Sequence, residues 1–181
     1  MELLKQLVEK FHVLASNVDE DALTTDDPWD TAKILALEKA RYVAKDRPDS
    51  LVIGSDTVVA VEQEDKTYLQ LAKPTDRLDA ARMLRTLSGR CHLVITGVAL
   101  AAPGWTRVEA DETKVNFRTL SEEEIWNYVD SGEPMDKAGA YAIQGGAAGF
   151  VERSEGSISN VVGLPLGLLG VMLNEFRLEM G

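Results

Sequence analysis

The chain contains one long β-branched run, Leu51-Val52-Ile53-Gly54-Ser55-Asp56-Thr57-Val58-Val59-Ala60-Val61, in which three polar side chains interrupt apolar ones. A β-branched apolar run of this kind is typical of a central, buried strand. A lone buried charge costs several kcal/mol unless it is paired or binds a metal. Asp56 therefore needs a cation, a metal or turn N–H groups, and the local pattern leaves these alternatives open.

Helical and strand patterns alternate around this run. Helices are predicted over residues 3–11, 30–44, 76–87, 122–130 and 166–178, and an antiparallel strand pair over 91–102 and 108–117. Asp76 is the expected N-cap of one helix, and Ser121 with Glu124 forms a capping-box pattern. With no repeat or linker, this mixed order predicts one α/β domain with a central twisted sheet, flanking helices and two lobes around a substrate cleft.

The composition narrows the possible partners. Thirty acidic against 19 basic residues give a net charge of −11, which opposes binding to nucleic acid polymers and to anionic membranes. Enzymes can still bind a phosphate substrate through a few local cations and a metal. No apolar run approaches the ~18 residues that a membrane span requires.

Cysteine and histidine point to a reduced protein without structural zinc. The single Cys91 begins an apolar segment, so we expect it to be a small core residue in a cytoplasmic protein. His12 and His92 have no Cys or His at metal-ligand spacing, so both are expected to serve packing. Glycine fingerprints for dinucleotides, Walker loops and nucleophile elbows are absent from the sequence.

Several polar residues are candidates for a phosphate site. Lys39, Lys73 and Lys137 lie among apolar or small residues, where they either contact a ligand or extend along the surface to water. The acidic residues 19–21 could supply metal ligands or form a solvated loop, and Gln144 could contact a base or close a turn. A triphosphate site needs cations of this kind together with carboxylates that hold Mg²⁺.

Together these segments resemble the Maf family of nucleoside triphosphate pyrophosphatases. In the first half the matching motifs are Glu2-Leu3-Leu4, Glu38-Lys39-Ala40, Gly54-Ser55-Asp56-Thr57-Val58-Val59, Ala72-Lys73-Pro74, Asp79-Ala80-Ala81-Arg82-Met83-Leu84 and Leu87-Ser88-Gly89. In the second half they are Thr96-Gly97-Val98, Gly132-Glu133-Pro134-Met135-Asp136-Lys137-Ala138-Gly139-Ala140-Tyr141, Ile143-Gln144-Gly145 and Asn160-Val161-Val162-Gly163-Leu164-Pro165-Leu166. The resemblance implies a single Maf-like domain over residues 1–181.

The resemblance also implies a reaction, because the family hydrolyses the α-β bond of a nucleotide to the monophosphate and pyrophosphate with Mg²⁺ or Mn²⁺. By this correspondence Asp56 activates water, and Asp19 and Glu20 join it as metal-side carboxylates. Lys39 and Lys73 hold the phosphate chain and offset the charge that develops on the leaving pyrophosphate.

Thr57 and Gln144 match family positions linked to base choice. Their pattern is that of the branch acting on dTTP and UTP, which implies a cytoplasmic hydrolase that removes pyrimidine nucleotides, CTP or modified nucleotides included. A homodimer is the family-based expectation.

The chain departs from the family pattern at its start. Family members place an apolar strand and Ser-x-Arg-Arg just before Glu-Leu-Leu, where this sequence has Met1. Relative to the family, the sequence therefore predicts an N-terminally truncated chain that is destabilised and weakly active, and restoring such a segment should raise pyrophosphate release. The alternative is a catalytically impaired nucleotide-binding or regulatory module.

Overall fold

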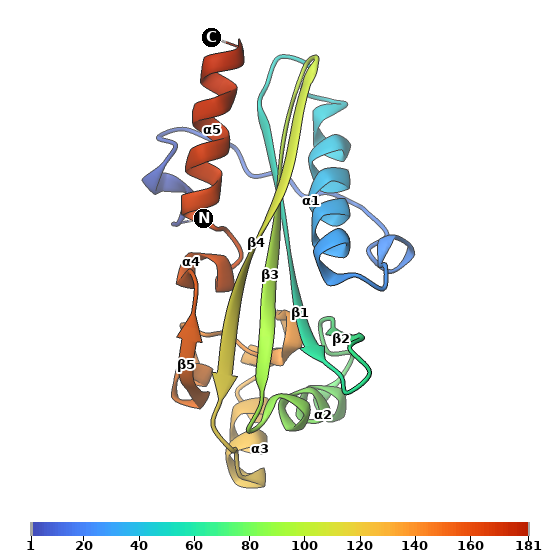
Figure 1. Ribbon diagram of the computed structural model, residues 1–181, viewed down its shortest axis with the longest axis vertical. Coiled ribbons are helices and arrows are strands. Elements are labelled where there is room, and N and C mark those ends of the chain that lie inside the picture. The colour runs from blue at the N-terminus through green and yellow to red at the C-terminus, as the bar shows by residue number, and fades with distance from the viewer. Residues whose placement is uncertain (1, 181) are drawn as a thin grey trace.

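The computed structural model describes residues 2–180 and is built on a five-stranded antiparallel sheet with the order β2-β1-β3-β4-β5 (Figure 1). The strands are β1 (Val52–Glu62), β2 (Tyr68–Leu71), β3 (Cys91–Ala102), β4 (Trp105–Phe117) and β5 (Val151–Glu155). The helices are α1 (Pro28–Ala44), α2 (Arg77–Leu87), α3 (Glu122–Asp130), α4 (Ile158–Val161) and α5 (Leu166–Met180). Short 3-10 turns are η1 (Leu4–Gln6), η2 (Asp21–Leu23), η3 (Glu133–Asp136), η4 (Ala138–Ala140) and η5 (Gly146–Phe150).

The two faces of the sheet are covered differently. Helix α1 packs along one face, where Ala36 and Ala40 lie against Ala99 of β3. On the other face, α5 covers one end of the long strands and α2 with α3 lies toward the other end (Figure 1). This face therefore carries two separate apolar clusters, one around Met172 of α5 and one around Leu84 of α2. They form the two lobes that the sequence predicts, on one shared sheet.

The predicted helix starts are confirmed by their caps. Asp76 accepts a hydrogen bond from the N–H of Asp79 at 2.8 Å, so α2 begins where the sequence indicates. Ser121 and Glu124 form a complete capping box at the start of α3. The strand pair predicted to be antiparallel is β3 with β4.

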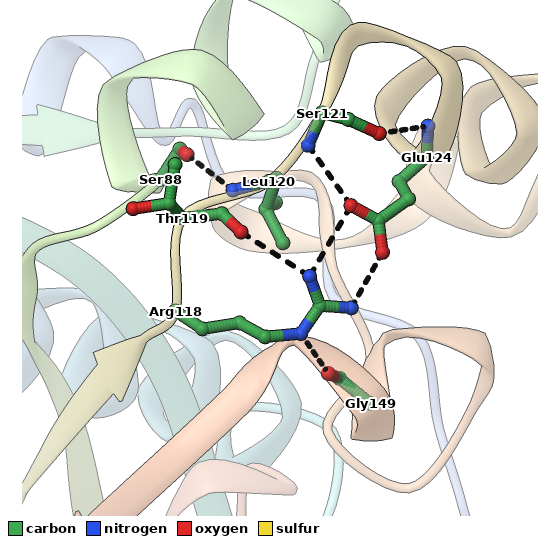
Figure 2. A network of polar contacts seen from close by, with 7 residues as sticks. All are labelled: Ser88, Arg118, Thr119, Leu120, Ser121, Glu124 and Gly149. Atoms are coloured by element: carbon green, nitrogen blue, oxygen red, sulfur yellow. Dashed lines mark hydrogen bonds and ion pairs between the residues drawn. The ribbon is translucent and has the colours of Figure 1, made fainter.

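Arg118, which follows β4, holds the α3 end of the molecule together (Figure 2). Its guanidinium donates to the Glu124 carboxylate at 2.6 and 3.2 Å and to the carbonyl of Gly149 at 2.8 Å. The same carboxylate accepts from the N–H of Ser121, so the capping box and the η5 turn share one cation. These contacts hold the pKa of Glu124 down at about 2, with the Arg118 hydrogen bond as the main cause.

Three smaller predictions are wrong. The N-terminal helix is only the η1 turn, which has no side-chain cap; short isolated helices are marginal, and Leu4 and Leu7 pack near α5 without one. Cys91 is exposed because it is the first residue of β3, at the end of the sheet. His12 is exposed, whereas His92 packs in the core as predicted.

Among residues 2–180, no helix has the length and apolar character needed to cross a bilayer.

Candidate active site

Strand β1 presents its central polar residues to opposite faces of the sheet. Side chains alternate along a strand, so Asp56 faces α1 while Ser55 and Thr57 face the side of α4 and α5. Strand β2 pairs with β1 only from Val59 onward. Within residues 2–180, the outer edge of β1 beside Asp56 therefore has no strand partner.

On the α1 face, one lysine joins two carboxylates. The ammonium Nζ of Lys39, from α1, lies 2.5 Å from Oδ1 of Asp56 and 2.6 Å from Oε1 of Glu20. The Lys39 and Asp56 side chains are only 20% and 12% exposed, while Glu20 lies at the rim with 45% exposed. Asp56 thus has the cationic partner that its buried position requires.

Glycines in β1 and β3 bring α1 close enough for this contact. A Cβ on Gly54 would lie 2.2 Å from the Ala36 carbonyl oxygen, and one on Gly97 would lie 2.1 Å from that of Ala32. Gly97 is also the cross-strand partner of Asp56. The helix can therefore rest on backbone at these positions, and Lys39 reaches the strand.

The three charges shift one another's pKa values. Burial is the main influence on Asp56 and raises its pKa, because the Lys39 hydrogen bond offsets the desolvation only in part. Burial alone would lower the pKa of Lys39, but the hydrogen bonds to Asp56 and Glu20 outweigh it and the pKa is raised. The Lys39 hydrogen bond lowers the pKa of Glu20. Asp56 is the carboxylate readier to accept a proton, as a general base should be.

On the other face, a cavity of about 220 Å³ lies beside β1, and Asp56 also lines it. Its lining combines charges with an apolar wall: Ser55, Asp56, Thr57, Val59, Lys73, Val94, Asp136, Lys137, Ala138, Tyr141, Val161 and Val162. Lys137 forms an ion pair with Asp136. Lysines beside an apolar wall suit a ligand with an anionic part and a flat, less polar part.

Buried hydroxyl groups lie behind this cavity. Oγ1 of Thr57 is 2.9 Å from Oγ1 of Thr96, its cross-strand neighbour on β3. Thr96 is fully buried and donates to the backbone carbonyl of Asn160 at 2.9 Å, which connects β1 with α4 through β3.

The structure brings together most of the residues predicted from the sequence. Asp56, Thr57 and Lys73 line the cavity, and Lys39 contacts both Asp56 and Glu20.

The structure leaves two predicted residues apart from this group. Asp19 is exposed and accepts a hydrogen bond from the N–H of Ala22, and Gln144 is exposed in the turn after Tyr141 and does not line the cavity. Thr96 was not predicted as a site residue, although a polar residue inside an apolar strand is the same signal that identified Asp56.

The site offers two carboxylates of the kind that bind Mg²⁺. In the part of the chain that the structure describes, no group of three or more His, Cys, Asp or Glu side chains could hold a metal ion. Glu20 and Asp56 nevertheless converge on one cation, the Lys39 ammonium. Mg²⁺ is commonly bound by one or two carboxylates, with phosphate oxygens and water completing its coordination.

Comparisons with known proteins identify the family of this chain. The family model described as "Maf-like protein" matches residues 1–176. A protein from Geobacillus sp. (strain WCH70) named dTTP/UTP pyrophosphatase is 49% identical over 90% of this chain and 87% of its own length. Proteins of the same name from Symbiobacterium thermophilum and Aquifex aeolicus are 47% and 42% identical, over 97% and 99% of this chain and 88% and 92% of their own lengths. The chain belongs to the Maf-like protein family.

Proposed function

We propose that this chain is a nucleoside triphosphate pyrophosphatase that hydrolyses dTTP and UTP to the monophosphate and pyrophosphate. The observation that carries the proposal is the Lys39 bridge between Asp56 and Glu20, at a strand edge that also borders the cavity. The names of the relatives supply the substrate class. The cavity lining carries charged side chains, among them Lys73 and Lys137, beside an apolar wall, which gives separate places for the phosphates and the base.

In this proposal Asp56 acts as the general base. Its carboxylate takes a proton from water, the water oxygen bonds to the α-phosphorus, and the bond from that phosphorus to the α-β bridging oxygen breaks. The electron pair stays on the leaving pyrophosphate. The raised pKa of Asp56 supports this role, because a general base works best when its pKa lies nearer the pH at which the enzyme operates.

Cations stabilise the charge that moves onto the leaving group. Lys39 lies at the carboxylates and Lys73 lines the cavity, so both are placed to contact phosphate oxygens. Asp56 and Glu20, with Asp19 next to Glu20 in the sequence, would hold Mg²⁺ or Mn²⁺, which would supply positive charge to the phosphates. Thr57 contacts the base in this proposal, and Gln144 reaches it from its exposed turn.

Neighbouring carboxylates allow a matched test. Pyrophosphate release is measured with Mg²⁺ or Mn²⁺ and a panel of dTTP, UTP, CTP and 7-methyl-GTP. Glu20→Gln removes the carboxylate that contacts Lys39 and should reduce release about 10-fold or more, the effect of losing one charged hydrogen bond. The control, Asp19→Asn, changes an exposed carboxylate outside the Lys39 contacts and should have a smaller effect.

The same assay separates the alternative function. A binding or regulatory module would be stabilised by nucleotides in thermal denaturation without releasing pyrophosphate. We further infer a cytoplasmic homodimer, from the reduced single cysteine and the family resemblance. Light scattering after size exclusion measures the oligomeric state, and a monomer at micromolar concentration would contradict it.

A further inference from the structure

The hydroxyl chain behind the cavity determines where the Thr57 proton points. A backbone carbonyl can only accept hydrogen bonds, so the single hydroxyl proton of Thr96 is directed to the carbonyl of Asn160, 2.9 Å away. The oxygen of Thr96 can then only accept in its contact with Thr57, also at 2.9 Å. The single proton of Thr57 is therefore committed to Thr96.

Because Thr57 donates its proton to Thr96, its hydroxyl oxygen can only accept a hydrogen bond from a ligand in the cavity. A free threonine hydroxyl either donates or accepts and cannot distinguish the two kinds of ligand atom. The carbonyl of Asn160 lies in the α4 backbone, and Asn160 is itself fully buried, with its side-chain amide donating to the Val94 carbonyl at 2.9 Å. This carbonyl also accepts from the N–H of Gly163 at 2.9 Å, and reversing the chain of hydroxyls would leave the Thr96 oxygen facing it at 2.9 Å with no proton between two acceptors.

We propose that Thr96 is a specificity-positioning residue, which makes Thr57 a hydrogen-bond acceptor that selects a pyrimidine carrying an N–H at ring position 3. This inference rests on the proposed function, since it assigns the base end of that substrate to the Thr57 side of the cavity. Uracil and thymine carry the N3–H donor, whereas cytosine has an unprotonated N3 that would face the lone pairs of Thr57. The terminal amide of Gln144 carries both a donor and an acceptor, so it lacks this fixed polarity.

Thr96→Val tests the proposal because valine keeps the shape and removes the hydroxyl. The proton of Thr57 is then released and can turn toward the N3 of cytosine. The ratio of kcat/KM for UTP to that for CTP should be about 10- to 100-fold in the unchanged protein, the usual effect of one mismatched buried hydrogen bond, and should approach one in the variant. Thr96→Ser restores the hydroxyl and should restore the ratio.

Thr113→Val is the matched control. Thr113 is also fully buried, and its hydroxyl contacts Ser157 and the Asn160 side chain rather than Thr57. This variant loses comparable buried hydrogen bonds and should keep the UTP:CTP ratio of the unchanged protein. An unchanged ratio in Thr96→Val, or an equal loss in Thr113→Val, would overturn the proposal.

Binding measurements separate this inference from the proposed function. Calorimetry with UMP and CMP reports the same discrimination without turnover. If no triphosphate is hydrolysed but UMP binds about 10-fold or more tightly than CMP, and only Thr96→Val removes this difference, the proposed function fails and the polarity assignment stands. If the unchanged protein hydrolyses UTP but binds UMP and CMP equally, the polarity assignment fails and the proposed function stands.

Discussion

Gly54→Ala tests whether the close approach of α1 to β1 builds the site. The added methyl carbon would lie 2.2 Å from the Ala36 carbonyl oxygen, 2.8 Å from the Ala40 nitrogen and 2.9 Å from the Ala40 Cβ. Ordinary contact begins near 3.4 Å, so α1 has to move by roughly 1 Å. Overpacking costs about 1–3 kcal/mol, and because the obstacle is backbone we expect a value near 3 kcal/mol.

The same movement should also reduce catalysis. Lys39 precedes Ala40 on α1, so displacing the helix lengthens the 2.5 Å contact between Lys39 and Asp56. We expect pyrophosphate release to fall about 10- to 100-fold at temperatures where the variant is still folded, since a misplacement of about 1 Å can cost 100-fold.

Urea unfolding followed by circular dichroism measures the stability change, with Gly167→Ala as the control. A Cβ at Gly167, on α5, meets no atom within 4 Å, and alanine favours a helix, so this variant should be stabilised by up to about 1 kcal/mol. If Gly54→Ala and the unchanged protein unfold at the same urea concentration, the close-approach argument is wrong.

Further predictions concern the base, a core histidine and a helix cap. Asp56→Asn should lower pyrophosphate release about 10²- to 10⁴-fold while the protein stays folded, because Lys39 keeps its pair with Glu20; unchanged turnover would exclude Asp56 as the base. Burial lowers the pKa of His92 from 6.5 to about 4, so the unfolded state binds more protons between these values. The free energy of unfolding should therefore fall by about 3 kcal/mol as the pH drops from 6.5 to 4. Urea titrations across that pH range should show that the free energy of unfolding depends less on pH in His92→Leu than in the unchanged protein. Equal slopes against pH would contradict the lowered pKa of His92. Ser121→Ala should cost about 1 kcal/mol in the same titration through loss of the cap, whereas Ser121→Asp should cost little.

Local patterns predicted the elements whose signals lie within a few residues. The capping box at Ser121 and the N-cap at Asp76 are such signals, and both helices begin there. Strand β5 and helix α4 were not predicted. Strand β5 carries the polar sequence Val151-Glu152-Arg153-Ser154-Glu155, whose strand state comes from pairing with β4, an interaction between distant parts of the chain.

The site likewise has some features that the sequence determines and others that only the tertiary structure decides. The sequence by itself determined that Asp56 interrupts a buried strand and needs a partner, because the cost of burying a charge does not depend on the fold. Only the tertiary structure decided that Lys39 is this partner and that it also holds Glu20, since glycines on two strands set how closely α1 approaches. The direction of the Thr57 hydroxyl was also decided in three dimensions, because it depends on Thr96 and on a carbonyl 64 residues beyond Thr96 in the chain.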